Sequence, residues 1–190
     1  MHPKRRCKDV ACNVSTHGPQ NIKRIVNYPM IKEPSQSIIM YTDGSSLGNP
    51  GPGGYGTLLL HGKYRKELSE GFRLTTNNRM ELMAVIVGLE TLKHKDSEVT
   101  IYTDSKYVVD AVEKGWLLNW IRIRFKGKKN SDLWMRFNDI YQLHRVKFVW
   151  VKGHADIPGN EKCDQLAVAA ANGSNLSEDL GYLKEKSLSD

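Results

Sequence analysis

Apolar residues in the first third of the chain follow the spacing of short β-strands. Three β-rich runs, at 38–43, 55–61 and 64–73, are joined by short connections, which predicts an antiparallel meander of three strands. Residues 44–54, between the first two runs, are dense in glycine and proline. We therefore expect a loop at 44–54.

From residue 77 onward, helical spacing alternates with short strands. Residues 77–94 carry a single apolar stripe, which predicts a helix with Asn77 or Asn78 as its N-cap. The pattern then predicts, in chain order, a strand at 98–104, a helix from Ser105, a basic and Trp-rich stretch at 115–130, a helix at 131–143 capped by Ser131, a strand at 146–151, a loop at 152–159 and a helix at 160–171.

This order of elements predicts an α/β fold built on a five-stranded mixed sheet. The first three strands are antiparallel, and the strand–helix–strand connections that follow add parallel strands by right-handed crossovers. Helices should then cover both faces of the sheet.

Composition fits a globular domain with extensions at both ends. The chain has 190 residues, 39% of them hydrophobic and 26% charged, and a mean hydropathy of −0.50. No apolar run approaches the roughly 18 residues that a membrane span needs, so we expect no membrane partner. We expect residues 1–37 to be a basic, disordered arm, 38–171 to be the folded domain, and 172–190 to be a polar tail that is frayed from about residue 174.

The distribution of charge and cysteine narrows the function classes. The net charge is +7, and residues 114–136 alone carry seven basic residues against one acid, interleaved with tryptophan. A basic balance of this kind favours a polyanionic partner. The sparse, odd set of cysteines (Cys7, Cys12 and Cys163) argues against a disulfide framework and favours a reducing, cytoplasmic location.

Two predicted strands end in the same local sequence, Tyr-Thr-Asp, at Asp43 and Asp104. If these strands are parallel neighbours, both carboxylates lie at the edge of the sheet where open α/β sheets bind ligands. Glu81, on the border of the apolar stripe, and Asp164, near the start of the last helix, could join them. Gathered carboxylates repel one another, and a hard cation such as Mg²⁺ removes the conflict. Each acid alone is more simply a surface or capping residue, so only the joint pattern favours a metal site.

The motifs around these acids resemble those of bacterial type 1 ribonuclease H over about residues 38–171. The resemblance is carried by Tyr-Thr-Asp43-Gly-Ser, Gly-Asn49-Pro-Gly-Pro-Gly-Gly-Tyr-Gly, Thr75-Thr76-Asn77-Asn78-Arg79-Met80-Glu81, Tyr-Thr-Asp104-Ser105, Trp-Val-Lys152-Gly153-His154-Ala and Asn160-Glu161-Lys-Cys163-Asp164. It implies a ribonuclease H-like fold and a metal-dependent endonuclease that hydrolyses the RNA strand of RNA–DNA hybrids, leaving 5′-phosphate and 3′-hydroxyl ends.

The same resemblance implies roles for particular residues. Asp43, Glu81, Asp104 and Asp164 match the four metal-binding acids, for Mg²⁺ with Mn²⁺ as a substitute, two ions with substrate and at least one without. His154 matches a loop histidine that assists proton transfer or product release. The residues that match or are expected to make substrate contacts are Asn49, Thr76, Asn77, Asn78, Lys106 and, in a basic handle, Trp116, Trp120, Lys126, Lys128 and Lys129.

Lys106 departs from the family pattern, since many relatives carry Gln there, and a phosphate contact is the role we expect for it. We expect a monomer whose partner is an RNA–DNA hybrid. Two other readings stay open: a hybrid-binding protein without catalysis, and a transposase or junction nuclease that acts on DNA with a similar set of acids.

Overall fold

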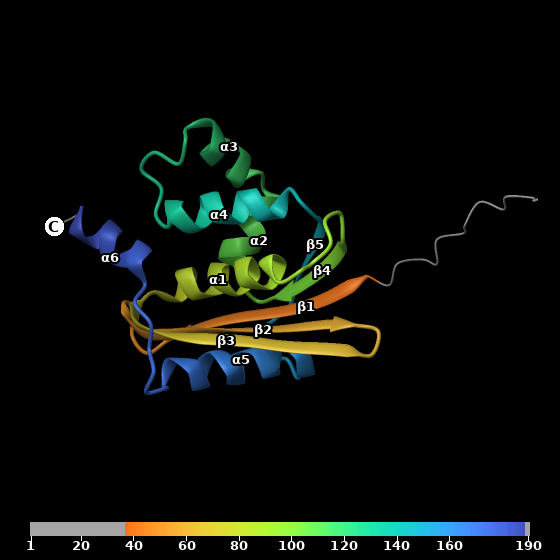
Figure 1. Cartoon of the computed structure of the whole chain (residues 1–190). Coiled ribbons are helices and arrows are strands. Elements are labelled where there is room, and N and C mark those ends of the chain that lie inside the picture. Colours follow the sequence, from red (N-terminus) through yellow and green to blue (C-terminus); the bar gives the residue numbers. More distant parts are fainter. Residues whose placement is uncertain (1–36, 189–190) are drawn as a thin grey trace, which may run out of the picture. The chain divides into compact units, whose positions relative to one another are not determined.

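The computed structural model describes residues 37–188, so the predicted arm lies outside the described residues apart from Ser37. One mixed sheet has the strand order β3-β2-β1-β4-β5 (Figure 1). The strands are β1 (Ile38–Ser46), β2 (Gly51–His61), β3 (Tyr64–Thr75), β4 (Glu98–Thr103) and β5 (Arg145–Trp150). β2 is antiparallel to β1 and β3, whereas β4 is parallel to β1 and β5. The predicted five-stranded mixed sheet is confirmed.

Helices cover both faces of this sheet, as predicted. The described residues form α1 (Asn77–Glu90), α2 (Lys106–Glu113), α3 (Trp116–Arg122), α4 (Ser131–Tyr141), α5 (Pro158–Ala171) and α6 (Leu180–Ser187). Figure 1 shows α1 against one face, α4 beyond it, and α5 against the opposite face. None of the helices within residues 37–188 is long and apolar enough to cross a membrane.

Helix α1 is the centre of the core because it has neighbours on two sides. The sheet lies under it and α4 packs over it, so Leu82, Ile86 and Leu89 have no exposed surface. The apolar stripe that predicted this helix is therefore only part of its buried surface.

The predicted loop at 44–54 is wrong for most of its length. β1 continues to Ser46 and β2 begins at Gly51, so only residues 47–50 connect them. The glycines of β2 serve a close approach rather than a turn: a Cβ at Gly54 or Gly56 would lie within 3 Å of atoms of α5. Local composition favours a loop, but the docking of α5 on the sheet explains glycine within a strand.

The predicted helix caps also differ from those observed. Thr76, not Asn77 or Asn78, is the N-cap residue of α1, and it makes no side-chain cap bond. The backbone N–H of Asn77 instead donates to Oδ1 of Asn49, 3.2 Å away and 28 residues earlier in the sequence. At α4 the N-cap residue is Asn130, one position before Ser131. A cap supplied from a distant loop leaves no local sequence signal.

The C-terminal segment is ordered rather than frayed through residue 188. Ser177 exchanges backbone hydrogen bonds with Gly71 and Arg73 of β3, and α6 follows directly. Asp179 caps this helix by accepting a hydrogen bond from the backbone N–H of Tyr182 at 3.1 Å.

A buried arginine joins this C-terminal segment to the core. Arg79 is 1% exposed, and its guanidinium donates two hydrogen bonds of 2.7 Å to Asp179. The same group donates to both carboxylate oxygens of Asp132 in α4, at 2.9 and 2.7 Å. Asp179, itself 3% exposed, also accepts a 2.7 Å bond from the hydroxyl of Thr75. One guanidinium thus links α1, α4 and the start of α6.

We predict that Arg79→Met lowers the free energy of unfolding by about 3–5 kcal/mol, because it leaves Asp179 charged and buried without its cation. Urea unfolding followed by circular dichroism measures the change. Arg73→Met is the matched control, since Arg73 pairs with Glu178 at 3.0 Å where both side chains are exposed. Its loss should stay below about 1 kcal/mol. Equal losses in the two variants would contradict the role given to Arg79.

Candidate active site

Two acids meet at one edge of the sheet because β1 and β4 are parallel and in register. Thr42 pairs with Thr103, which places the following residues, Asp43 and Asp104, beside each other. Together with Glu81 they form a cluster in which one carboxylate oxygen from each lies within 4.8 Å of the others. The expectation that both strand ends deliver a carboxylate to the same edge is confirmed.

Glu81 reaches this edge because α1 passes very close to the end of β1. Gly44 lies against the backbone of α1 at Met80 and Glu81, where a Cβ would collide. The Glu81 side chain is 7% exposed, so it faces the sheet as its position on the apolar stripe predicted. Only glycine at position 44 allows this approach, which brings a helix-borne carboxylate beside Asp43.

Burial and mutual repulsion set the electrostatics of this cluster. Burial, followed by the charges of Asp104 and Asp164, raises the pKa of Asp43 to about 7, although the backbone N–H of Gly44 donates to its Oδ1 at 2.8 Å. Burial and the charges of Asp43 and Asp104 also raise the pKa of Glu81 well above its ordinary value. The protein therefore holds these acids together at an electrostatic cost.

The donor set fits a divalent cation. Oε2 of Glu81 is buried and has no hydrogen-bond partner among the described residues. Its Oε1 accepts a long bond, 3.4 Å, from the side-chain amide of Asn77. A buried carboxylate oxygen without a donor is rare, and hard oxygen ligands of this kind suit Mg²⁺. Asp43, Glu81 and Asp104 would hold such an ion.

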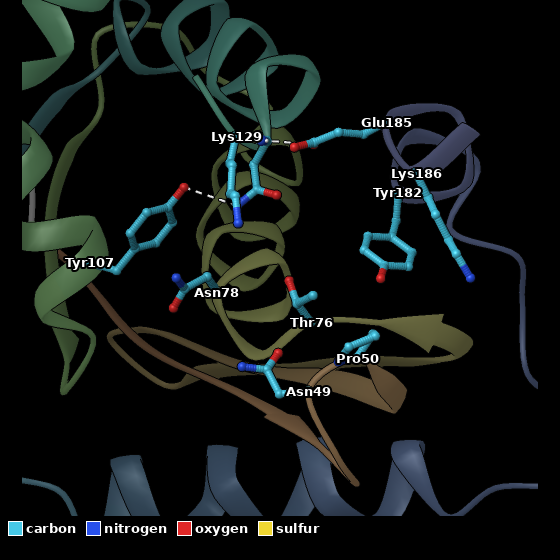
Figure 2. Close-up of a pocket in the computed structure, with 10 residues that line it drawn as sticks. Asn49, Pro50, Thr76, Asn78, Tyr107, Lys129, Tyr182, Glu185 and Lys186 are labelled. Carbon is cyan, nitrogen blue, oxygen red and sulfur yellow. Dashed lines mark hydrogen bonds between the residues drawn. The ribbon is translucent and has the colours of Figure 1, made fainter. Parts of the chain in front are cut away.

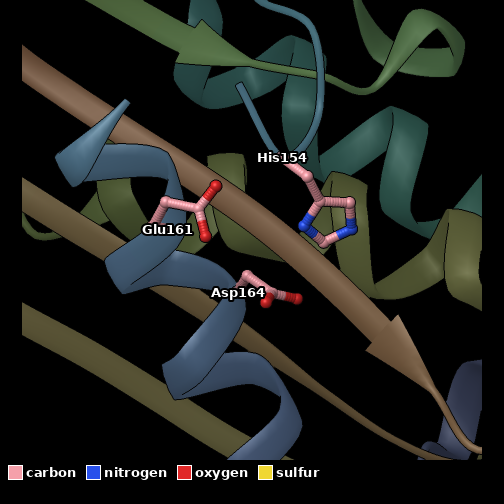
Figure 3. Close-up of side chains that lie close together, drawn as sticks. All are labelled: His154, Glu161 and Asp164. Atoms are coloured by element: carbon pink, nitrogen blue, oxygen red, sulfur yellow. The ribbon is translucent and has the colours of Figure 1, made fainter. Parts of the chain in front are cut away.

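Asp164 and His154 meet in a second group on α5 and the loop before it. The ligand atoms of His154, Glu161 and Asp164 lie within 4.8 Å of one another, and Figure 3 shows the three side chains turned toward one space. The charge of Asp164 also acts on Asp43, so the two groups are neighbours. Gly153, in the loop before α5, lies close to the Asp104 carboxylate, which a side chain at this position would displace.

Glu161 is a candidate site residue that the sequence analysis missed. It lies three residues before Asp164 on α5, so both carboxylates project from the same helix face. The i, i+3 spacing of Glu161 and Asp164 is a sequence signal for this pairing, but the sequence analysis names Glu161 only within a family motif.

Four of the predicted substrate contacts line one pocket of about 450 Å³. Asn49, Thr76 and Asn78 lie at its floor beside the start of α1, and Lys129 reaches into it from the turn before α4 (Figure 2). Asn77 is not part of this lining; its amide faces Glu81 and its backbone N–H is bound by Asn49. The structure thus separates Asn77, next to the acids, from the pocket group.

Lys106 lies beside the acid cluster on a tryptophan. Its Nζ is 5.0 Å from the centre of the Trp150 ring, and the indole N–H of Trp150 donates to the backbone carbonyl of Asp104 at 3.0 Å. This cation–π contact holds the lysine near the end of β4.

The basic handle combines exposed cations with a graded set of tryptophans. Trp134 is fully buried, Trp120 is partly buried with its ring centre 5.2 Å from that of Trp134, and Trp116 is 41% exposed. Lys128 lies over the Trp120 ring at 5.7 Å, and Lys126 is exposed. Trp134 therefore belongs to the core, while the outer part of the handle is exposed.

Comparison with known proteins gives one consistent family. The ribonuclease H family model matches residues 35–172. The chain is 58% identical over 150 residues to the ribonuclease H of Desulforamulus reducens, covering 76% of this chain and 94% of that protein. It is 55% identical over 152 residues to the ribonuclease H of Rippkaea orientalis, covering 77% and 93%.

The fold is also similar to solved structures of type 1 RNase H proteins. The crystal structure of LC9-RNase H1, a type 1 RNase H with the type 2 active-site motif, has a TM-score of 0.68 and 31% identity, covering 80% of this chain and 82% of that one. LC11-RNase H1, in complex with an RNA/DNA hybrid, has a TM-score of 0.54 and 26% identity, covering 70% and 99%.

We predict that the metal-free protein loses stability as the pH rises from about 4 to about 7. In this window the native state keeps a proton on Asp43, whose pKa is about 7, while the unfolded chain has lost it at its ordinary value of 3.8. The loss is up to about 1.4 kcal/mol per pH unit for each retained proton. Urea unfolding in EDTA across this range measures it.

The control is Asp43→Asn, which removes the titrating group. Its stability should vary less with pH and should exceed that of the wild type at pH 7. Parallel pH curves for the two proteins would show that Asp43 is not the group under strain.

Proposed function

The chain belongs to the ribonuclease H family, metal-dependent endonucleases that hydrolyse RNA in RNA–DNA hybrids, and we propose that it cuts the RNA strand at Asp43, Glu81, Asp104 and Asp164. The cut leaves a 5′-phosphate and a 3′-hydroxyl. The observation that carries the proposal is the buried carboxylate of Glu81, which lies beside Asp43 and has an oxygen without a hydrogen-bond donor among residues 37–188. Protein interiors tolerate such an arrangement where a cation completes it.

The four acids form two adjoining candidate sites for divalent ions. Asp43 lies on β1, Glu81 on α1 and Asp164 on α5, and Asp104 directly follows β4. Asp43, Glu81 and Asp104 form the buried place, and Asp164 stands beside it with His154 and Glu161. Two bound Mg²⁺ ions, or Mn²⁺ in their stead, would supply an activated water nucleophile and neutralise charge on the scissile phosphate. Asp43 must be ionised to act as a ligand, so its raised pKa links ion binding to pH.

Bond making and breaking fix the products. The water oxygen forms a bond to phosphorus, the bond from phosphorus to O3′ breaks, and O3′ takes up a proton. The phosphate therefore stays on the 5′ side of the downstream nucleotide. His154, exposed on the loop next to Asp164, is the side chain we assign to moving a proton at this end of the site.

Selection of RNA requires contact with the 2′-hydroxyl, which distinguishes it from DNA. Asn49 and Asn77 are hydrogen-bonded to each other through the backbone N–H of Asn77, so one loop and one helix start present two amides together. Asn77 also faces Glu81, which places its amide beside the acids. We assign both to the hybrid's minor groove, and Thr76, Asn78 and the handle residues Trp116, Trp120, Lys126, Lys128 and Lys129 to strand contacts.

We propose that the protein is a monomer that acts on a hybrid. Lys106, fixed on Trp150 next to Asp104, would contact a phosphate close to the cut. We also propose a cytoplasmic location, which the sparse cysteines support; among the described residues Cys163 is free and buried.

We predict that Asp43→Asn lowers Mg²⁺-dependent cleavage of a labelled hybrid by on the order of 10³-fold, equivalent to about 4 kcal/mol of transition-state stabilisation. Binding of the hybrid should survive because the fold and the strand contacts remain. Asp96→Asn is the matched control, an exposed aspartate before the other end of β4, and should cleave normally.

The same assay separates the rival functions. If the wild type binds hybrid but cuts nothing at any Mg²⁺ or Mn²⁺ concentration, the protein is a hybrid-binding module. Equal cutting of duplex DNA would instead place it with DNA nucleases that share the arrangement of acids.

We predict that His154→Ala lowers kcat by about 10²-fold with little change in KM, since a proton-transfer group acts after the substrate is bound. His94→Ala is the control: His94 is exposed and lies in the segment between α1 and β4, near Ile38, at the opposite end of the sheet. A matching loss in both variants would argue against the assignment.

A further inference from the structure

The C-terminal helix α6 forms one wall of the pocket that holds the predicted strand contacts. Tyr182, Glu185 and Lys186 line this pocket opposite Tyr107, with Asn49 and Thr76 at its floor (Figure 2). α6 begins at Leu180, beyond residue 172, where the match to the family model ends. The pocket is therefore built partly by a segment that lies beyond the match to the family model.

Several interactions hold α6 in this place. Its first turn is anchored by Asp179, which is buried and bound by Arg79 and Thr75. Farther along, Glu185 accepts a 3.0 Å hydrogen bond from the backbone N–H of Asn130, at the start of α4. A helix tied at both ends to the core is a fixed wall rather than a loose tail.

The chemistry of the pocket suits an anion. Lys129 and Lys186 bring two cations, while the one carboxylate in the lining, Glu185, is engaged by a backbone N–H. Neutral donors complete the set: the amides of Asn49 and Asn78 and the hydroxyls of Thr76 and Tyr182. Lysine with amide and hydroxyl donors is the usual way in which proteins contact backbone phosphate.

Helical geometry assigns different faces to the two lysines of α6. Tyr182 and Lys186 are four residues apart and share the face that lines the pocket. Lys184, also exposed, is absent from the lining and lies about half a turn away. The helix thus contains its own control position.

We propose that α6 is a nucleic-acid-binding element in which Lys186, with Tyr182 beside it, contacts a backbone phosphate of the hybrid. The proposal rests on the proposed function and extends it to a helix beyond residues 35–172, which the family model matches. The occupant is one phosphodiester group, whether it comes from the DNA strand or from the RNA strand.

Fluorescence anisotropy with a labelled hybrid tests the proposal in the Asp43→Asn background, so that nothing is cut. Lys186→Ala should weaken binding roughly fivefold at low salt. It should also reduce the slope of log Kd against log salt concentration by about 1, because one phosphate contact fewer releases about one counterion fewer. Lys184→Ala makes the same change in charge and should weaken binding less than twofold. Tyr182→Phe should give a smaller loss without a change in slope.

Hybrids with neutral methylphosphonate linkages in one strand identify the source of the phosphate. If the strand that Lys186 contacts is the neutral one, Lys186→Ala should not weaken binding of that hybrid any further. Binding of the hybrid in which the other strand is neutral should still weaken roughly fivefold. Equal effects of Lys184→Ala and Lys186→Ala, or no effect of either, would overturn the proposal. A wild type that binds but does not cut would overturn the proposed function and leave the role of α6 standing.

Discussion

The ion pairs of Arg79 are the interaction on which the arrangement of this molecule depends most. One buried guanidinium bonds two carboxylates, Asp132 on α4 and Asp179 before α6, and both are held against the first turn of α1. The same end of α1 carries Asn78, which lines the pocket, and Glu81, which joins the acids. These charges are paired at close range with good hydrogen-bond geometry. Burying them as pairs therefore costs less free energy than leaving one of them buried without its partner.

The acid cluster follows the opposite principle. Asp43 and Glu81 are buried beside each other, and burial together with the neighbouring carboxylates raises the pKa of each. At Arg79 the chain satisfies its own charges, so that region contributes to stability. At Asp43 burial and neighbouring acids raise the pKa of the carboxyl to about 7, so that region is more stable when Asp43 is protonated. The contrast separates the structural charges from the functional ones within a single helix turn.

The basic residues of the chain also differ in what surrounds them. In the stretch 114–136 the one acid, Asp132, is occupied by Arg79, while most of the cations are exposed. Lys129 turns from this stretch into the pocket that α6 closes with Lys186. The two lysines of this pocket thus come from segments far apart in the sequence, and neither segment forms the pocket alone.

Local patterns in the sequence determined the strands, most helices and the identity of the acids. Apolar spacing is a property of neighbouring residues, and an aspartate at the end of each of two parallel strands must lie at one edge of the sheet. Patterns failed where a distant segment decides. The glycines of β2 indicate a loop until α5 is seen against them, and Asn49 caps α1 from 28 residues away. Residues 174–188 are too polar to predict order, since their order depends on Asp179 meeting Arg79, a hundred residues earlier. Local sequence therefore predicts the elements and the candidate residues. Which charged groups pair, and which are buried, is decided only by the tertiary structure, because both depend on contacts between segments that are far apart in the sequence.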